Sequence, residues 1–197
     1  AAKNNLKTLL LEEKNEIGGS TIYQDSDFFK IQNKRSSDWL KNETNELKKI
    51  NNLKIKTRTS VAAFHNYNYI LARENLTDHL NKEEKKNKIR QRLLKIRAKK
   101  VIIATGSIER PLIFNNNDRP GIMLSSAVKK YADYYGAICG KKNVFFTNND
   151  SAYESAISLN KKGLNVEAII DIREKSDSEL VKEVEKIGIQ IYWSHTV

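Results

Sequence analysis

The spacing of apolar and polar residues in the first quarter of the chain predicts a strand followed by a helix. The apolar run at residues 8–13 ends in two acids and predicts a buried parallel strand, and residues 1–5 before it predict the end of a helix. Residues 36–53 carry apolar side chains at helical spacing, with Ser37 or Asp38 available as the N-terminal cap. Strand and helix in this order are the first sign of an α/β fold.

The middle of the chain predicts strands that pair with near neighbours. Residues 53–57 alternate between apolar and polar, as a half-buried strand does. Two apolar segments, 61–64 and 69–72, flank a turn at 66–68 and predict a β-hairpin. The charged segment 75–87 that follows is expected to form a long loop.

Another strand is predicted just before a candidate cofactor-lining turn. Residues 92–98 alternate again and lead into a fully apolar run, residues 101–104, which we interpret as a buried strand. Thr105 and Gly106 follow this run directly. A small residue and a glycine at the carboxyl end of a strand allow backbone to approach a bound cofactor closely. A simple strand-ending turn explains the same two residues equally well.

The last third of the chain repeats the strand–helix alternation more clearly. A strand, a turn, an amphipathic helix stopped by Gly163 and a second strand form a βαβ unit of about 30 residues. A further helix and strand follow. The predicted elements are, in order, the strand 143–147, turn 148–150, helix 151–162, strand 166–171, helix 178–187 and strand 189–193. The alternation predicts an α/β architecture with parallel sheets.

Composition narrows the class of protein without selecting a function. The net charge of +11 first suggests nucleic acid, but the lysines are spread along the whole chain. The densest run, residues 82–88, contains two acids and no aromatic side chain, which favours a solvated loop over a nucleic-acid groove. We therefore expect no nucleic-acid partner.

Single sequence features argue against a membrane segment, an internal disulfide and a metal site. No apolar stretch approaches the roughly 20 residues that span a bilayer, so we expect no membrane segment. Cys139 is the only cysteine, which excludes an internal disulfide and fits a reducing, cytoplasmic location. His65, His79 and His195 lie far apart without ligand spacing, and we expect no metal site.

Glu13 is the first candidate for chemistry, because it ends an apolar strand. In dinucleotide-binding folds an acid at this place accepts hydrogen bonds from the two hydroxyl groups of a ribose. The Gly-x-Gly-x-x-Gly loop that completes the motif would lie about 20 residues upstream, before Ala1. Many strands end in Glu, so this acid alone does not decide the function.

Asp171 holds the same place in the later βαβ unit. The turn of that unit, residues 147–151, contains no glycine, and Asp150 adds negative charge where a phosphate would sit. An N-terminal cap of the following helix is the favoured role for Asp150. A phosphate site in this turn stays open as the alternative.

Several segments are specific enough to indicate a family. The run at residues 92–112, the segment Asn-Asp-Arg-Pro-Gly at 117–121, and Thr-Asn-Asn-Asp-Ser-Ala-Tyr at 147–153 carry most of the signal. Glu12-Glu13 with Gly18-Gly19-Ser20, and Ser37-Asp38-Trp39-Leu40, agree with them. Across essentially its whole length the chain resembles the alpha subunit of heterotetrameric sarcosine oxidase.

This resemblance implies an oxidoreductase acting on CH–NH groups. The family oxidatively demethylates sarcosine to glycine, with tetrahydrofolate and oxygen, and yields methylenetetrahydrofolate and hydrogen peroxide. The alpha subunit would bind NAD, while FAD and the amine-oxidising site belong to the beta subunit and FMN lies near the subunit interface. The partners would be the beta, gamma and delta subunits, and a folate-binding domain would follow this part of the alpha subunit.

The resemblance also implies a fold and a set of site residues. The fold would be an FAD/NAD(P)-binding core of two Rossmann-like domains, with a β-hairpin segment and without its first strand and glycine loop. The first domain would cover residues 1–135 and the second, incomplete one residues 136–197. Glu13 would hold the adenosine ribose, and Val61 would contact adenine through its backbone. Other cofactor-lining residues would be Gly18, Gly19, Ser20, Thr105 and Gly106, with no catalytic residue in this chain.

Two alternatives stay open at the level of sequence. One is a subunit of another FAD- or NAD-dependent amine or opine dehydrogenase with the same two-domain core. The other is a non-catalytic scaffold that kept the fold and lost the cofactor. The oxidation catalysed by the partner subunit would separate the first from a sarcosine oxidase, and bound NAD would separate the second.

Overall fold

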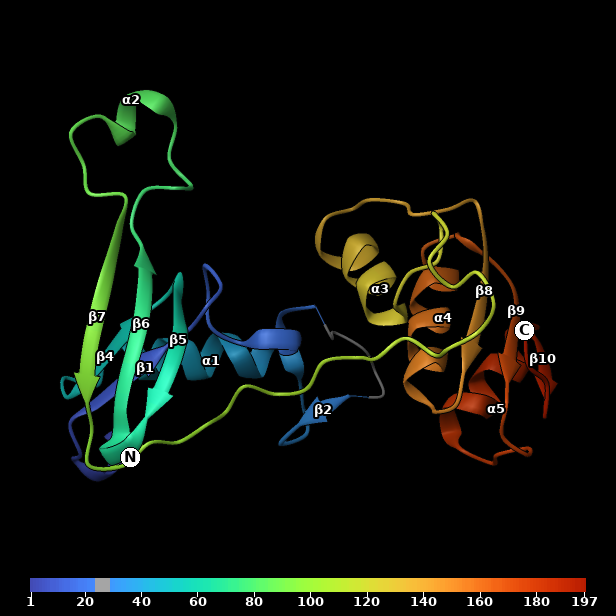
Figure 1. The fold of residues 1–197 in the computed structure, drawn as a ribbon. Coiled ribbons are helices and arrows are strands. Elements are labelled where there is room, and N and C mark those ends of the chain that lie inside the picture. The colour runs from blue at the N-terminus through green and yellow to red at the C-terminus, as the bar shows by residue number, and fades with distance from the viewer. Residues whose placement is uncertain (24–28) are drawn as a thin grey trace. The chain divides into compact units, whose positions relative to one another are not determined.

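A computed structural model describes residues 1–23 and 29–197 of the chain (Figure 1). It divides into two compact units: of the described residues, the first contains 1–23 and 31–106, and the second contains 29–30 and 107–197. The units are described separately below. The boundary predicted between residues 135 and 136 concerns nucleotide-binding domains rather than compact units, and it stays a prediction.

The first unit contains a parallel pair of strands, as the sequence predicted. Strand β1 (Thr8–Leu11) pairs with β4 (Leu53–Lys56), with Thr8 opposite Leu53 and Leu11 opposite Lys56. The predicted helix before β1 is one 3₁₀ turn, Ala2–Asn4. Only Leu9 of β1 is exposed, so the strand is half-buried where full burial was expected.

Helix α1 (Ser36–Lys48) connects the two parallel strands and is shorter than predicted. Its N-cap is Arg35, whose side chain forms no capping hydrogen bond, so the expected caps Ser37 and Asp38 lie inside the first turn. The polar Lys49 to Asn52 segment ends the helix and leads into β4. Before α1, the two-residue strands β2 (Lys30–Ile31) and β3 (Lys34–Arg35) pair with each other.

An antiparallel sheet of three strands completes the first unit and confirms the predicted hairpin. Its order is β5 (Thr59–His65), β6 (Tyr69–Asn75) and β7 (Gln91–Arg97). The turn Asn66–Asn68 joins β5 to β6, with Tyr67 in the left-handed region at φ 61°. A bulge lies between Val61 and Ala63.

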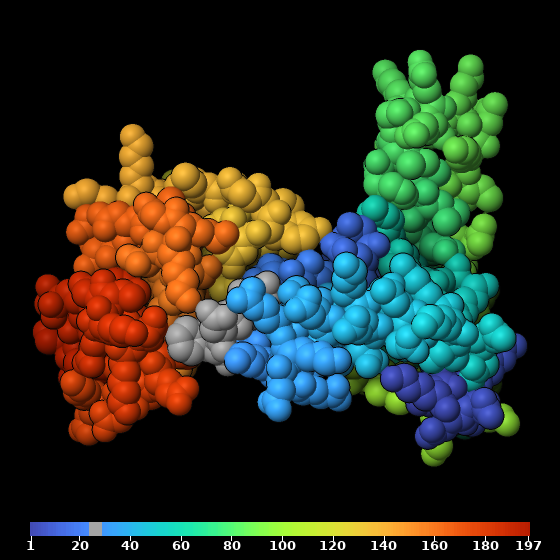
Figure 2. Space-filling model, turned by 180° about the vertical axis from the view of Figure 1, so that it is seen from behind, coloured from blue at the N-terminus to red at the C-terminus, as the bar shows by residue number. Residues whose placement is uncertain are grey.

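The segment between β6 and β7 is the predicted charged loop, with one short helix that the sequence did not predict. Helix α2 (Lys82–Lys85) is closed by a capping box, in which Asn81 and Glu84 each accept the other's backbone N–H. Figure 2 shows this loop standing out from the rest of the first unit. Its exposure agrees with a solvated run of mixed charge.

The apolar run at residues 101–104 is not a strand, contrary to the prediction. Residues 98–114 form no regular secondary structure, and Ile102 and Ile103 are 79% and 73% exposed. A strand forms where a neighbouring strand completes its backbone hydrogen bonds. Within the described residues none pairs with this run, so hydrophobicity alone gave the wrong prediction.

The second unit is a three-stranded parallel sheet with helical connections, as predicted. The strands are β8 (Lys142–Thr147), β9 (Asn165–Asp171) and β10 (Gln190–Trp193), in the spatial order β10-β9-β8. Helix α4 (Ser151–Lys161) joins β8 to β9, and α5 (Glu179–Lys186) joins β9 to β10. Each lies within a residue or two of its predicted bounds. Helix α3 (Ser125–Tyr134) precedes the sheet and packs on α4.

The core of the second unit explains why its pattern was easy to read. Apolar side chains at helical spacing on α4 and α5 meet alternate residues of β8 and β9. Each fully buried aliphatic side chain of this kind stabilises the fold by roughly 1.5–3 kcal/mol. The most deeply buried members are Tyr153, Ala156, Leu159, Ile169, Val181 and Val184.

The structure as a whole confirms an α/β fold with parallel strands and an added β-hairpin. Among the described residues no helix has both the length and the apolar character to cross a membrane.

Candidate cofactor site

The carboxyl end of β1 is fixed by backbone hydrogen bonds to the chain that leaves β4. The Glu12 N–H donates to the Lys56 carbonyl at 2.9 Å, and the Thr59 N–H donates to the Glu12 carbonyl at 2.8 Å. On the other side of Glu13, the Lys14 carbonyl accepts a hydrogen bond from the Arg58 N–H at 2.7 Å. These bonds hold the segment around Glu13 against the start of β5.

The two adjacent acids at this place have different surroundings. The Glu12 carboxylate accepts the Lys14 N–H at 2.9 Å and so closes a local turn. Glu13 is exposed, and no hydrogen bond or ion pair from another described residue reaches its carboxylate. Glu13 therefore has the unused acceptor oxygens that a ribose diol needs, as the predicted role requires.

Val61 lies where its backbone can serve the same site. Thr59 and Val61 both pair across β6, with Glu74 and Ala72 respectively, and Thr59 turns its N–H away from β6 toward Glu12. Backbone groups of an antiparallel strand alternate in direction with a period of two residues. The Val61 N–H and carbonyl therefore face the outer edge of β5, the edge at which the Thr59 N–H donates to the Glu12 carbonyl.

Gly18 and Gly19 form a tight backbone turn that only partly depends on glycine. Gly18 has φ 130°, and a Cβ there would approach the Leu40 side chain of α1 to 2.6 Å. Gly19 has φ 58° and open space around it, and Ser20 beside it is exposed. The two glycines open a 3₁₀ turn, Gly19–Ile22, that packs against α1.

Thr105 and Gly106 lie in the irregular segment that replaces the predicted strand. Both are exposed, and Gly106 has φ 71° with nothing near its missing Cβ. No hydrogen bond between described residues joins either of them to the segment around Glu13. The segment around Glu13 is thus hydrogen-bonded to the start of β5, two residues before Val61, and no such bond from the described residues ties Thr105 or Gly106 to it.

Asp171 ends β9 in the second unit, as predicted, but it is fully buried and already occupied. The Tyr153 hydroxyl donates to its Oδ2 at 2.9 Å, and the Arg173 guanidinium donates to the same oxygen at 2.8 Å. Burial alone would raise the pKa of Asp171, but the hydrogen bonds from Arg173 and Tyr153 outweigh it and leave the pKa below the ordinary value. This carboxylate has no oxygen free for a ribose.

The same network raises the pKa of both donors. Burial, and then the hydrogen bond to Asp171, raise the pKa of the Tyr153 hydroxyl. The hydrogen bond to Asp171 is the main reason that the pKa of Arg173 lies above its usual range. The Trp193 ring stacks on Tyr153 with 6.1 Å between the ring centroids, which covers the network on one side.

Asp150 is the N-cap residue of α4, as predicted, but its side chain does not cap the helix. Its Oδ1 accepts from the Arg173 Nη2 at 2.8 Å, while Asn149 Oδ1 accepts the Ser151 N–H at 3.0 Å. The charged partner of Asp150 outcompetes a neutral backbone N–H.

Arg173 is the residue that the sequence analysis missed. The signal was present: Asp171 and Arg173 are two residues apart at the end of a strand, where side chains i and i+2 lie on one face. Among the described residues no cluster of His, Cys, Asp or Glu could hold a metal ion, and Cys139 is exposed.

Solved structures define the class of fold. No protein-family model matches the chain. L-proline dehydrogenase from P. horikoshii superposes with a TM-score of 0.66 and 24% identity, covering 90% of this chain and 33% of that one. An engineered water-forming NADPH oxidase bound to NADPH superposes with a TM-score of 0.59 and 16% identity. That match covers 98% of this chain and 42% of the oxidase. The chain shares its fold with part of each of these two oxidoreductases.

Proteins related in sequence give a more specific resemblance than the solved structures do. The chain is 38% identical over 173 residues to the sarcosine oxidase alpha subunit of Corynebacterium sp. strain P-1, and 34% identical over 184 residues to that of strain U-96. The Rhizobium meliloti alpha subunit is 34% identical over 173 residues. These matches cover 88%, 93% and 88% of this chain, but it spans only 17–19% of the length of these relatives. The resemblance predicted from sequence is confirmed.

Proposed function

We propose that this chain is part of the NAD-binding core of a sarcosine oxidase alpha subunit. The observation that carries the proposal is the 34–38% identity to such subunits over 88–93% of the chain. The proposed enzyme demethylates sarcosine to glycine with oxygen and tetrahydrofolate, and forms methylenetetrahydrofolate and hydrogen peroxide. It assembles with beta, gamma and delta subunits in the cytoplasm, and FAD and FMN are held elsewhere in the complex.

The role of this chain is to hold the adenosine half of NAD in the first unit. The Glu13 carboxylate accepts hydrogen bonds from the two ribose hydroxyl groups, and the outward-facing backbone of Val61 contacts adenine. The unpaired carboxylate of Glu13, and the backbone bond that ties the neighbouring Glu12 to the outer edge of β5, support this arrangement. NAD, when bound, supplies a nicotinamide that carries a hydride.

The remaining residues of the proposed site are supported by fewer observations. Gly18, Gly19 and Ser20 are proposed to line the cofactor through the tight turn that they form. Thr105 and Gly106 belong to the proposal on the sequence resemblance alone, because the strand that was to position them is not formed. The proposed first domain is residues 1–135 and the second is residues 136–197.

The experiment measures NAD bound to the complete alpha subunit that contains this chain. The purified protein is denatured, and the released NAD is quantified by chromatography. We expect about one NAD per subunit in the wild type. The Glu13→Gln variant is expected to lose roughly tenfold or more in NAD affinity, since charge-assisted hydrogen bonds to both ribose hydroxyls are weakened.

Glu12→Gln is the matched control. It removes the same charge one residue away, but its side-chain oxygen can still accept the Lys14 N–H. We expect its NAD content to stay within twofold of wild type. A wild-type subunit without NAD, or equal losses in the two variants, would contradict the proposed site.

A further inference from the structure

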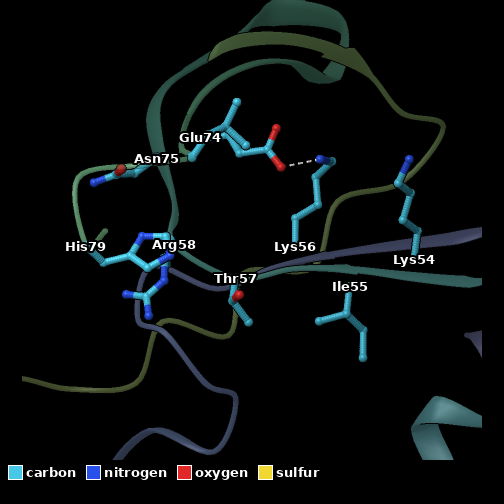
Figure 3. Close-up of a pocket in the computed structure, with 9 residues that line it drawn as sticks. Lys54, Ile55, Lys56, Thr57, Arg58, Glu74, Asn75 and His79 are labelled. Carbon is cyan, nitrogen blue, oxygen red and sulfur yellow. Dashed lines mark hydrogen bonds and ion pairs between the residues drawn. The ribbon is translucent and has the colours of Figure 1, made fainter. Parts of the chain in front are cut away.

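A hollow in the first unit is lined by basic side chains, of which only Lys56 pairs with an acid among the described residues. Its volume is about 340 Å³, and it opens between β4 and the end of β6 (Figure 3). Its lining residues are Lys54, Ile55, Lys56, Thr57, Arg58, Glu74, Asn75, Leu76 and His79. None of these belongs to the cofactor site proposed above.

The cations reach the hollow because of strand periodicity. Residues two apart on a strand share a face, so Lys54 and Lys56 lie on one side of β4, and Ile55 and Thr57 on the other (Figure 3). Arg58 and His79 add two further side chains with N–H donors at one end of the hollow. The strand alternation thus places Lys54 and Lys56 along one wall, whereas Arg58, which follows β4 with φ 51°, turns its side chain to the other side, toward His79 (Figure 3).

The acids near the hollow are already compensated. Glu74 forms an ion pair with Lys56, and the Arg92 guanidinium lies 3.7 Å from its other oxygen. Asp78, next to His79 in sequence, accepts from Arg90 Nε at 2.6 Å and from Asn75 Nδ2 at 2.9 Å. The hydrogen bond from Arg90 is the main reason that the pKa of Asp78 is lowered. No described residue pairs in this way with Lys54, Arg58 or His79, so the hollow has a net positive charge.

Arg58 is held in a conformation that an arginine rarely adopts. Its φ is 51°, in the left-handed region. Two backbone hydrogen bonds keep it there: its N–H donates to the Lys14 carbonyl at 2.7 Å, and its carbonyl accepts the Asn75 N–H at 2.9 Å. Asn or Gly would adopt this backbone at lower cost. The arginine side chain is therefore not explained by the fold.

We propose that this hollow binds a phosphate group at the end where Arg58 and His79 lie, with these two side chains as its donors. A guanidinium matches phosphate geometry with two parallel N–H bonds, and an imidazole supplies a further donor. The group can come from free phosphate or from a sugar phosphate, and both present the same oxygens. Cofactor binding at Glu13 is a separate property.

The test is a calorimetric titration of the 197-residue protein with inorganic phosphate, and separately with ribose 5-phosphate, at one low ionic strength. We expect saturable binding in the wild type and roughly tenfold weaker binding in Arg58→Asn, because one charge-assisted pair is lost. Asn suits the left-handed backbone, so this variant keeps its fold. His79→Gln should weaken binding by a smaller factor, and Lys54→Gln, at the other end of the hollow, should change it less than twofold.

Arg73→Gln is the control, since Arg73 is an exposed arginine of β6 that does not line the hollow. It removes the same charge and should change phosphate affinity less than twofold. Tighter binding of ribose 5-phosphate than of phosphate assigns a sugar phosphate, and equal affinities assign the free anion. Absence of saturable binding, or equal losses in Arg58→Asn and Arg73→Gln, overturns the proposal. Glu13→Gln should leave phosphate binding intact, which separates this site from the cofactor site.

Discussion

Each unit of this protein ends a parallel strand with an acid, and the two acids have opposite environments. Glu13 is exposed and its carboxylate has no partner among the described residues, whereas Asp171 is 0% exposed and shared by Tyr153 and Arg173. The backbone around Glu13 is fixed by main-chain bonds, which leaves the side chain available for a ligand. An acid at or just after the end of a parallel strand is therefore open to solvent in one unit and occupied by the fold itself in the other.

Arg173 is the reason that the Asp171 carboxylate is occupied while that of Glu13 is not. Its guanidinium reaches both Asp171 and Asp150, so one cation neutralises the two acids that flank the glycine-free turn of the second unit. Asp171 is closed to a ribose as long as Arg173 stays there. The second unit has the βαβ topology of a nucleotide-binding fold, but this acid is committed to its own structure.

The largest expected effect comes from removing the buried acid. Asp171→Ala leaves Arg173 and Tyr153 without their shared partner, and breaking such a buried pair costs roughly 3–5 kcal/mol of unfolding free energy. Urea unfolding followed by Trp193 fluorescence in a Trp39→Phe background reports on the second unit, since Trp193 stacks on Tyr153. Glu13→Gln, followed by Trp39 fluorescence of the first unit in a Trp193→Phe background, should change stability by less than about 0.5 kcal/mol. Equal effects of the two variants would remove the contrast between the acids.

A second prediction addresses the first unit, in which backbone rather than side chains sets the geometry. Gly18→Ala places a Cβ at 2.6 Å from Leu40 and forces a residue with φ 130°. We expect a loss of roughly 1–3 kcal/mol in unfolding free energy, followed by Trp39 fluorescence in a Trp193→Phe background. Gly19→Ala meets open space at φ 58° and should cost about 1 kcal/mol. A larger loss for Gly19→Ala than for Gly18→Ala would show that contact with α1 is unimportant.

The two units also differ in how far the sequence predicted them. In the second unit, β8, α4, β9, α5 and β10 were predicted to within a few residues, because their apolar periodicity matches a core that is built from neighbours in sequence. In the first unit, residues 101–104 look like a buried strand, yet strand formation depends on a partner that hydrophobicity cannot reveal.

Site residues show the same limit. Glu13 could be proposed from its place at a strand end, but its freedom depends on Glu12 taking the Lys14 N–H, which a sequence does not state. Arg173 was missed because its importance arises from two acids, one of them 23 residues away. The local pattern of a sequence does not predict contacts between residues that are distant along the chain.

A third prediction uses the pH dependence of the buried acid. The pKa of Asp171 is lowered in the folded state below the ordinary value of 3.8, so its stabilisation is fully present above that value. It is lost as the pH falls through the lower folded-state pKa, because the unfolded chain takes up the proton first. Unfolding free energy of the second unit, measured between about pH 6 and pH 3, should fall more steeply in wild type than in Asp171→Asn. Parallel curves would contradict the assigned direction of the shift.

The smallest effect concerns Asp150 and distinguishes an ion pair from a helix cap. Asp150→Asn keeps a side-chain oxygen for capping and removes only the charge that pairs with Arg173. Because the side chains of both partners are about one-third exposed, at 33% and 35%, we expect a loss below about 1 kcal/mol. Raising the salt concentration should shrink the difference between wild type and Asp150→Asn, since salt screens an exposed pair. A difference that is independent of salt would instead favour a capping role. Asn149→Ala, which removes the acceptor of the Ser151 N–H, should cost about 1 kcal/mol at any salt concentration.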